Sequence, residues 1–200
     1  MCSSDLTNTP FGFRQYQGTG SAPTYEQIAV PIAYNASAIF FGDPVTPLNT
    51  GYVARSSSSG GTGDTQIAGI FIGCQYLSVA QKRTVWSNYW PGSDVASSST
   101  VTGYIVNDPN AKFLVQTDSS GAALTNINNT VGFTIGSGNT SNGISGAYLN
   151  MATAGTDNSE PFKIVSLVID PPGSNGTEAG AYNYAVVAFN NVSTKQLTGV

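Results

Sequence analysis

Short apolar runs, each ended by glycine, proline, asparagine or aspartate, recur between residues 27 and 189 of this 200-residue chain. The clearest are QIAGIFIGCQY at 66–76, FKIVSLVI at 162–169 and YNYAVVAF at 182–189. Runs of this length, rich in β-branched and aromatic residues and bounded by turn-forming residues, are typical of β-strands. Apart from one helical turn at 77–83, no segment is suited to a helix, so the pattern predicts an all-β chain.

Further strands are expected at 28–32, 38–41, 51–54, 83–90, 100–106, 111–117 and 131–135. The sequence NDPN at 107–110 lies between two of these strands and predicts that they form a hairpin. The glycine-rich segment 136–146 is expected to be a loop. Roughly eight to ten strands at this spacing predict an antiparallel β-sandwich or barrel of the jelly-roll kind.

Residues 1–25 have no periodic apolar pattern and contain glycine and proline at short intervals. We expect them to form an extended N-terminal arm outside the core, with residues 26–200 forming one β-domain. Phe11, Phe13 and Tyr16 interrupt this polar arm, with Arg14 among them. A solvated tail has no need of aromatic side chains, so the sequence predicts that the arm binds a partner.

Lys, Arg, Asp and Glu make up only 9% of the residues, against roughly 25% in a typical soluble domain. The net charge is −4 and the seven basic residues are scattered, whereas nucleic-acid binding needs a clustered basic surface. No apolar stretch reaches the roughly 20 residues that cross a bilayer, and residues 1–20 do not resemble a signal peptide. We therefore expect no nucleic-acid or membrane partner and synthesis in a cytoplasm, with Cys2 and Cys74 reduced.

The chain has no histidine, which excludes Ser-His-Asp and Cys-His nucleophilic sites and nearly all catalytic zinc sites. Cys74 lies in an apolar run and is expected to be a buried packing residue. Most of the carboxylates stand beside Pro, Gly or Ser in predicted turns, where aspartate caps the backbone. A catalytic acid pair and a calcium site stay open as alternatives. The sequence predicts a protein that is not an enzyme and needs no cofactor.

Trp86, Tyr89 and Trp90 lie within five residues. They can form a platform on which a sugar stacks. In the other interpretation, alternate side chains enter the core and the rest support a protein interface, where Trp and Tyr are enriched. We favour the interface interpretation and keep the sugar platform as the alternative.

Three segments resemble structural proteins of tailed-bacteriophage virions. The first is PFGFR at 10–14, which is similar to the segment that opens an arm in such proteins. The second is Ile28-Ala29 followed by YNASAIFFGDPV at 34–45, and the third combines 69–76, 82–83 and WSNYWPG at 86–92. The resemblance spans about residues 10–117 and concerns structural rather than catalytic motifs.

This resemblance implies a virion structural protein. The size of the chain, its lack of catalytic chemistry and its arm predict that it is a head decoration (cement) protein, which binds the major capsid protein on the virion surface and stabilises capsomer junctions. The resemblance also implies a β-rich homotrimer, assembled in the cytoplasm of a bacterial host. Phe11, Phe13, Arg14 and Tyr16 are the residues expected to bind the capsid, Arg14 through a carboxylate. The alternative is a carbohydrate-binding module of a phage head or tail fibre that uses the three aromatics at 86–90. A third class, a fibre depolymerase, would need two carboxylates close together in a cleft.

Overall fold

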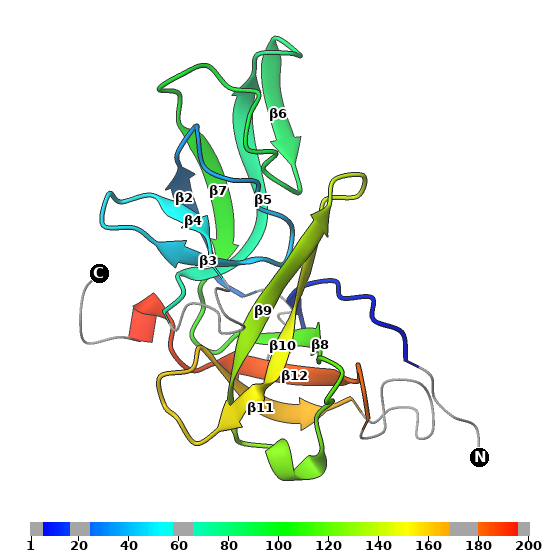
Figure 1. The fold of residues 1–200 in the computed structure, drawn as a ribbon. Helices are drawn as coiled ribbons and strands as arrows, with labels where there is room; N and C mark the ends of the chain where they lie inside the picture. Colours follow the sequence, from blue (N-terminus) through cyan, green and yellow to red (C-terminus); the bar gives the residue numbers. More distant parts are fainter. Residues whose placement is uncertain (1–5, 17–24, 58–65, 169–179, 196–200) are drawn as a thin grey trace.

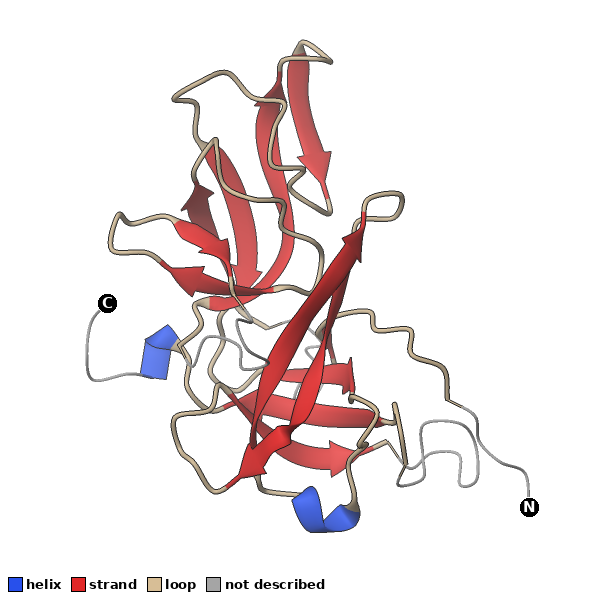
Figure 2. Ribbon diagram, viewed as in Figure 1, coloured by secondary structure: helices blue, strands red, loops and turns tan. Residues whose placement is uncertain are grey.

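The computed structural model describes residues 6–16, 25–57, 66–168 and 180–195. Within these segments the chain forms twelve β-strands and no α-helix; two short 3-10 turns lie at Leu124–Asn126 and Ser193–Lys195. Figure 2 shows the strands arranged in two lobes. The prediction of an all-β, mainly antiparallel fold is confirmed, and both lobes take the barrel form.

The upper lobe in Figure 1 is a sheet in the order β3-β4-β2-β7-β5-β6. Its strands are β2 Gln27–Ile32, β3 Pro44–Pro47, β4 Val53–Arg55, β5 Gly69–Ser78, β6 Arg83–Ser87 and β7 Val101–Val106. Because β3 also pairs with the start of β5, five strands close into a small barrel, and β6 remains outside the ring as an edge strand. Ile32, Phe71, Trp90 and Ile105 lie in its core.

The lower lobe is a sheet in the order β1-β8-β12-β11-β9-β10. Its strands are β1 Arg14–Gln15, β8 Lys112–Gln116, β9 Thr130–Asn139, β10 Ile144–Gly155, β11 Phe162–Leu167 and β12 Tyr184–Phe189. A parallel bridge between Thr117 and Leu149 closes five of these strands into a ring. Phe133, Phe162 and Phe189 lie in its core in mutual ring contact.

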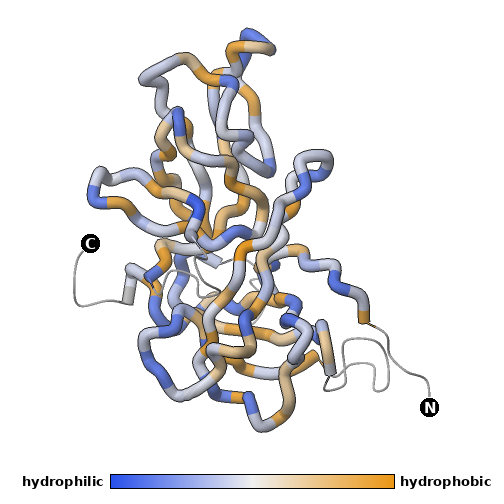
Figure 3. Tube along the Cα trace, viewed as in Figure 1, coloured by the Kyte–Doolittle hydropathy of each residue, from blue (hydrophilic) through white to orange (hydrophobic). Residues whose placement is uncertain are grey.

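Strands β5 and β7 join the two lobes. Ile70 and Val106 pair across them and belong to the lower core, whereas the next pair, Phe71 and Ile105, belongs to the upper core. A β-bulge after Phe71 shifts the register of β5 at this point. Figure 3 shows hydrophobic stretches passing from one lobe into the other along these strands. The upper and lower cores are therefore continuous through two strands.

The hairpin of β9 and β10 reaches up beside the upper lobe (Figure 1). At its tip, the Phe41 amide donates to the Gly143 carbonyl at 2.9 Å, and the Ser145 amide donates to the Phe41 carbonyl at 3.0 Å. The Asn88 side chain donates to the Asn142 carbonyl at 2.7 Å. These contacts fix the hairpin against the upper lobe.

Several expected elements are wrong in detail. The strands at 100–106 and 111–117 do not form a hairpin, because β7 pairs with β2 and β5 while β8 pairs with β1 and β12. The turn at 107–110 instead carries the chain from the upper lobe to the lower. The segment 136–146 is not a loop but the ends of β9 and β10 with a tight turn between them. Residues 77–83 end one strand and begin the next, with no helix, and 38–41 makes only isolated bridges.

Residues 6–16 of the arm are extended as expected but are not separate from the β-domain, and residues 1–5 and 17–24 lie outside the described residues. Strand β1 pairs with β8 at the edge of the lower sheet. The Gly12 amide donates to the Ala147 carbonyl at 3.2 Å, and the Phe13 amide donates to the Gly42 carbonyl at 2.9 Å. The boundary expected at residue 25 is therefore wrong for residues 6–16, which pack on the lower lobe.

Candidate functional site

Phe13, the central aromatic of the arm, is 1% exposed. Its ring stacks on Phe162, with centroids 4.4 Å apart and planes 16° apart, and meets Phe133 edge-on at 6.1 Å. Burial opposes the expectation that this side chain binds a capsid, because the chain's own lower core covers it. The arm needs an aromatic residue here to fill that core.

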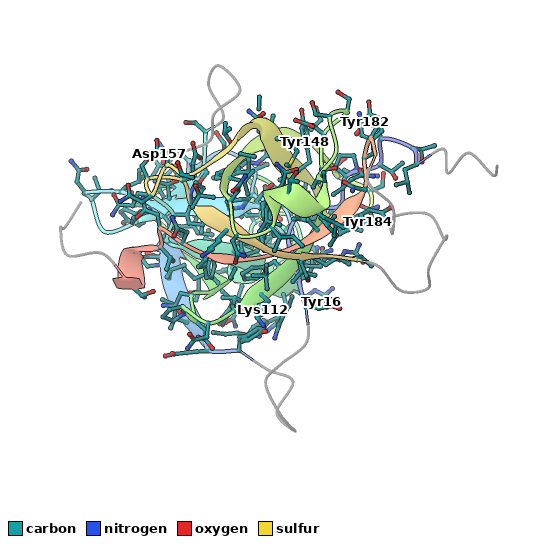
Figure 4. All side chains as sticks on the ribbon, turned by 90° about the horizontal axis from the view of Figure 1, so that it is seen from below. Tyr16, Lys112, Tyr148, Asp157, Tyr182 and Tyr184 are labelled. Carbon is teal, nitrogen blue, oxygen red and sulfur yellow. The ribbon has the colours of Figure 1, made fainter. Side chains whose placement is uncertain are left out.

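The other three arm residues lie along the same edge of the lower lobe. Phe11 packs on Tyr184 with ring centroids 5.7 Å apart, and the Arg14 guanidinium lies 5.0 Å from the Phe11 ring centroid. The Tyr16 amide donates to the Lys112 carbonyl at 2.8 Å, and Figure 4 shows these two residues side by side. Of the four predicted capsid-binding residues, Arg14 alone is exposed.

The three aromatics at 86–90 do not form one platform. Trp90 is fully buried; its indole donates to the Ala36 carbonyl at 3.2 Å and its ring meets Tyr76 edge-on. Tyr89 stacks on Phe40, with ring centroids 5.5 Å apart. Trp86 points the other way and is 67% exposed. Strict alternation would place Trp86 and Trp90 on the same face, so the expected alternation does not hold between them; Trp90 alone enters the core.

Trp86 belongs to a solvent-facing side of the upper lobe, which we call the outer face. Residues directly opposite one another on paired strands share a face, and the strand registers place Trp86 beside Gln75, Thr102 and Pro31 in one row. Neighbouring rows complete the outer face, whose members are Ala29, Pro31, Gly73, Gln75, Leu77, Thr84, Trp86, Thr102 and Tyr104. None of these side chains is charged, and Leu77 is 61% exposed.

Trp86 and Tyr104 form a stacked pair across the outer face. They stand on the two strands that flank β5, with ring centroids 5.4 Å and planes 15° apart. Gly73 on β5 lies opposite Tyr104 and contributes no side chain that would separate the rings. The Tyr104 hydroxyl donates to Gln75 Oε1 at 3.3 Å, which fixes the ring.

An open groove of about 520 Å³ runs beside this pair. The groove contains no Asp, Glu, Lys or Arg in its lining, which consists of Gln27, Ile72, Gly73, Cys74, Trp86, Ser87, Asn88 and Tyr104. Sequence reasoning missed Tyr104 and Gln27. The alternation in VTGYIV at 101–106, with a small Gly103 facing inward, is the signal that places Tyr104 outward.

An ion pair between the buried Asp43 and the partly buried Arg55 joins the upper lobe to the lower lobe. Asp43 is completely buried; Arg55 Nε lies 2.7 Å from Asp43 Oδ2, and the guanidinium also donates to the Gly136 carbonyl of β9 at 2.9 Å. The Phe40 amide and the Ser145 hydroxyl donate to the same carboxylate. Burial raises the pKa of the Asp43 carboxyl, and Arg55 and these hydrogen bonds oppose the rise.

The described aspartates cap the backbone, as expected from their turn positions. Side-chain oxygens of Asp43, Asp94, Asp108, Asp118 and Asp157 each accept a hydrogen bond from a backbone amide. Within residues 6–16, 25–57, 66–168 and 180–195, no group of three or more Cys, Asp or Glu side chains is placed to hold a metal ion. The groove beside Trp86 has no carboxylate in its lining.

A small polar cavity of about 110 Å³ lies on the lower lobe, between Asp118, Tyr148 and Tyr182. Figure 4 shows the two tyrosines on the same side of the barrel. Both Asp118 oxygens already accept backbone amides, from Ser120 and Met151. This carboxylate therefore accepts from the local turn and from the second half of β10.

Comparison with known proteins finds no match among family models, curated proteins or solved structures. No helix in the described segments has the length and apolar character needed to span a membrane. Functional inference therefore depends on the outer face, the groove and the sequence resemblance.

Proposed function

We propose that this chain is a non-enzymatic structural protein of a tailed-phage virion, which decorates the head and stabilises capsomer junctions. Its partner is the major capsid protein, and its binding surface is the outer face rather than the arm. The observation that carries this proposal is the pair of large apolar side chains, Trp86 and Leu77, that stand 67% and 61% exposed on a face without charged residues. The virion setting comes from the sequence resemblance.

The arm is a poor binding surface because its aromatics serve the chain's own fold. Phe13 is buried and Phe11 packs on Tyr184. The outer face has the opposite character, since strands hold its side chains in fixed positions and leave them in solvent. Large aromatic side chains with little conformational freedom are enriched at the centres of protein interfaces.

Burying an exposed leucine or aromatic side chain stabilises a complex by about 1.5–3 kcal/mol. When several copies bind one shell, these contributions act together. A face without charges also avoids the cost of removing ions from water. Attachment through it is expected to change little with salt concentration, because screening acts on charged groups.

Leu77 and Leu124 offer a matched test. Leu124 is 65% exposed, close to the 61% of Leu77, but lies in the 3-10 turn at the opposite end of the molecule. Heads assembled without this protein are mixed with purified wild-type, Leu77→Ser or Leu124→Ser chains, and binding is measured by co-sedimentation. Leu77→Ser is expected to weaken binding at least about tenfold, the equivalent of about 1.4 kcal/mol. Leu124→Ser is expected to bind like wild type; equal binding by both variants contradicts the proposal.

A further inference from the structure

We propose that the groove beside Trp86 and Tyr104 is a binding site for a neutral sugar, with Trp86 as the stacking platform. The site shares Trp86 with the proposed capsid contact, whose other anchor, Leu77, does not line the groove. A chain attached to a head through this face cannot stack a sugar on the same ring, so the two partners exclude one another. The inference uses a different set of side chains from the predicted group at 86–90.

The first observation is the orientation of the Trp86 ring. One side of the indole stacks on Tyr104, with centroids 5.4 Å apart, and yet the residue is 67% exposed. A ring that is covered on one side and still mostly exposed presents its other side to solvent. The C–H-bearing face of a pyranose ring is apolar, and stacks on an aromatic side chain held rigid in this way.

The second observation is the chemistry of the rim. Gln27 is exposed, and its amide makes no hydrogen bond in the described part of the chain, so it can both donate and accept. Ser87 also lines the groove, but it lies opposite the core residue Cys74, so its hydroxyl is on the other face of β6 from Trp86 and is not a donor to the sugar. Donors and acceptors at the edge of an aromatic platform match the hydroxyl groups of a sugar.

The third observation is charge. The groove has no Asp, Glu, Lys or Arg in its lining, so an anionic or cationic ligand would lose water without gaining a partner of opposite charge. A neutral sugar meets no such cost. The volume of the groove, about 520 Å³, falls within the range of small-molecule sites, roughly 300–1,000 Å³.

Tryptophan fluorescence gives a direct assay on the whole chain, because Trp90 is buried and Trp86 is the exposed reporter. Maltohexaose, cellohexaose and chitohexaose are titrated into the protein, with polygalacturonate as an anionic comparison. At least one neutral oligosaccharide is expected to shift the emission to shorter wavelength and to saturate at millimolar concentration or below. The absence of any shift with all three neutral sugars overturns the proposal.

Variants separate the groove from its surroundings. Trp86→Ala and Gln27→Ala are each expected to weaken sugar binding at least about tenfold. Binding by Trp86→Ala, which lacks the exposed tryptophan, is measured by calorimetry. Leu77→Ser is expected to bind sugar like wild type while binding heads more weakly, because Leu77 belongs to the capsid contact and does not line the groove. Circular dichroism confirms that each variant is folded. Unchanged sugar binding in Trp86→Ala contradicts the assignment of the platform.

Discussion

Phe13 and Phe162 stack with ring centroids 4.4 Å apart, although one lies in the N-terminal arm and the other begins β11. Phe13 is 1% exposed and Phe162 is fully buried. The contact makes the arm a part of the lower barrel. The aromatic side chains of the arm thus serve the fold, and the outer face of the upper lobe is the candidate binding surface.

Replacing Phe13 with alanine is expected to lower the free energy of unfolding by about 3–5 kcal/mol, because it leaves a cavity between two other phenylalanine rings. Urea denaturation followed by circular dichroism measures the change. Phe11→Ala is the control: Phe11 is only half-buried, and a smaller loss, about 1 kcal/mol, is expected. An unchanged midpoint for Phe13→Ala would show that the arm is not part of the folded core.

The arm illustrates what a single sequence leaves open. The absence of apolar periodicity correctly predicted that the described part of the arm is extended, and the sequence shows three aromatic residues in it. Whether those rings fill a partner's surface or the chain's own core depends on Phe133 and Phe162, more than a hundred residues away. No local pattern records such a distant contact, so the function drawn from the arm did not follow from its residues.

Strands were predicted well where an apolar run was continuous, as at β5, β7 and β12. The turn at 107–110 was also real, since the Ala111 amide donates to the Asp108 carbonyl at 2.9 Å. Its flanking strands nevertheless belong to different sheets. The residues of a turn determine that the chain changes direction there, but they do not determine which strands pair. Strand β10 was missed because small and polar residues dilute its apolar alternation.

At the candidate site, sequence reasoning identified Trp86 but grouped it with the wrong neighbours. Proximity along the chain suggested Tyr89 and Trp90, whereas strand pairing brings Tyr104 into contact with Trp86. Because side chains alternate along β6, Trp86 and Val85 point to opposite faces of the sheet. The pairing of β6 with β5, and of β5 with β7, then places Tyr104 next to Trp86. The site is thus a product of sheet register.

Asp43→Asn is expected to destabilise the protein by about 2 kcal/mol at neutral pH. Both carboxylate oxygens of Asp43 accept hydrogen bonds, whereas the asparagine amide has one oxygen that accepts and an NH₂ group that cannot. One carboxylate oxygen accepts the Phe40 amide and Arg55 Nε, the other the Ser145 hydroxyl and the second Arg55 nitrogen. Chemical denaturation measures the loss. Asp108→Asn is the control, since it caps a turn as an acceptor and asparagine does the same; its change is expected within about 0.5 kcal/mol.

The stability difference between wild type and Asp43→Asn is expected to decrease as pH rises. Burial raises the pKa of Asp43 above its ordinary value of 3.8, so the folded state binds this proton more tightly than the unfolded chain. The stability due to the protonated group is complete below pH 3.8 and falls as pH rises through the raised pKa. The difference in unfolding free energy between wild type and Asp43→Asn should therefore shrink over that window. A difference that grows with pH would mean that Arg55 outweighs burial.

Cys74 is expected to be unreactive in the folded protein. Its side chain is 1% exposed, burial raises the pKa of its thiol to about 12, and the thiol donates to the Tyr89 carbonyl at 3.4 Å. Only the thiolate is nucleophilic. In a Cys2→Ser variant, iodoacetamide at pH 8 should label Cys74 only as fast as the chain unfolds, with full labelling in urea. Native labelling at the rate of a free thiol would contradict the buried placement.

Self-association as a trimer remains a prediction from the low charge and aromatic content of the chain. Sedimentation equilibrium over a range of concentrations should show a three-chain species. Leu124→Ser serves as a control for loss of a single exposed apolar side chain away from the outer face. A monomer at every concentration, and also on the particle, would remove trimerisation from the account.

The central claim is that the outer face, not the arm, contacts the phage head. A cryo-electron microscopy reconstruction of a particle carrying this chain tests it most directly. The account predicts that Trp86 and Leu77 face the shell while Phe13 stays stacked on Phe162 within the lower lobe. A map in which residues 6–16 have left the barrel and lie along the capsid, with the outer face in solvent, would contradict it.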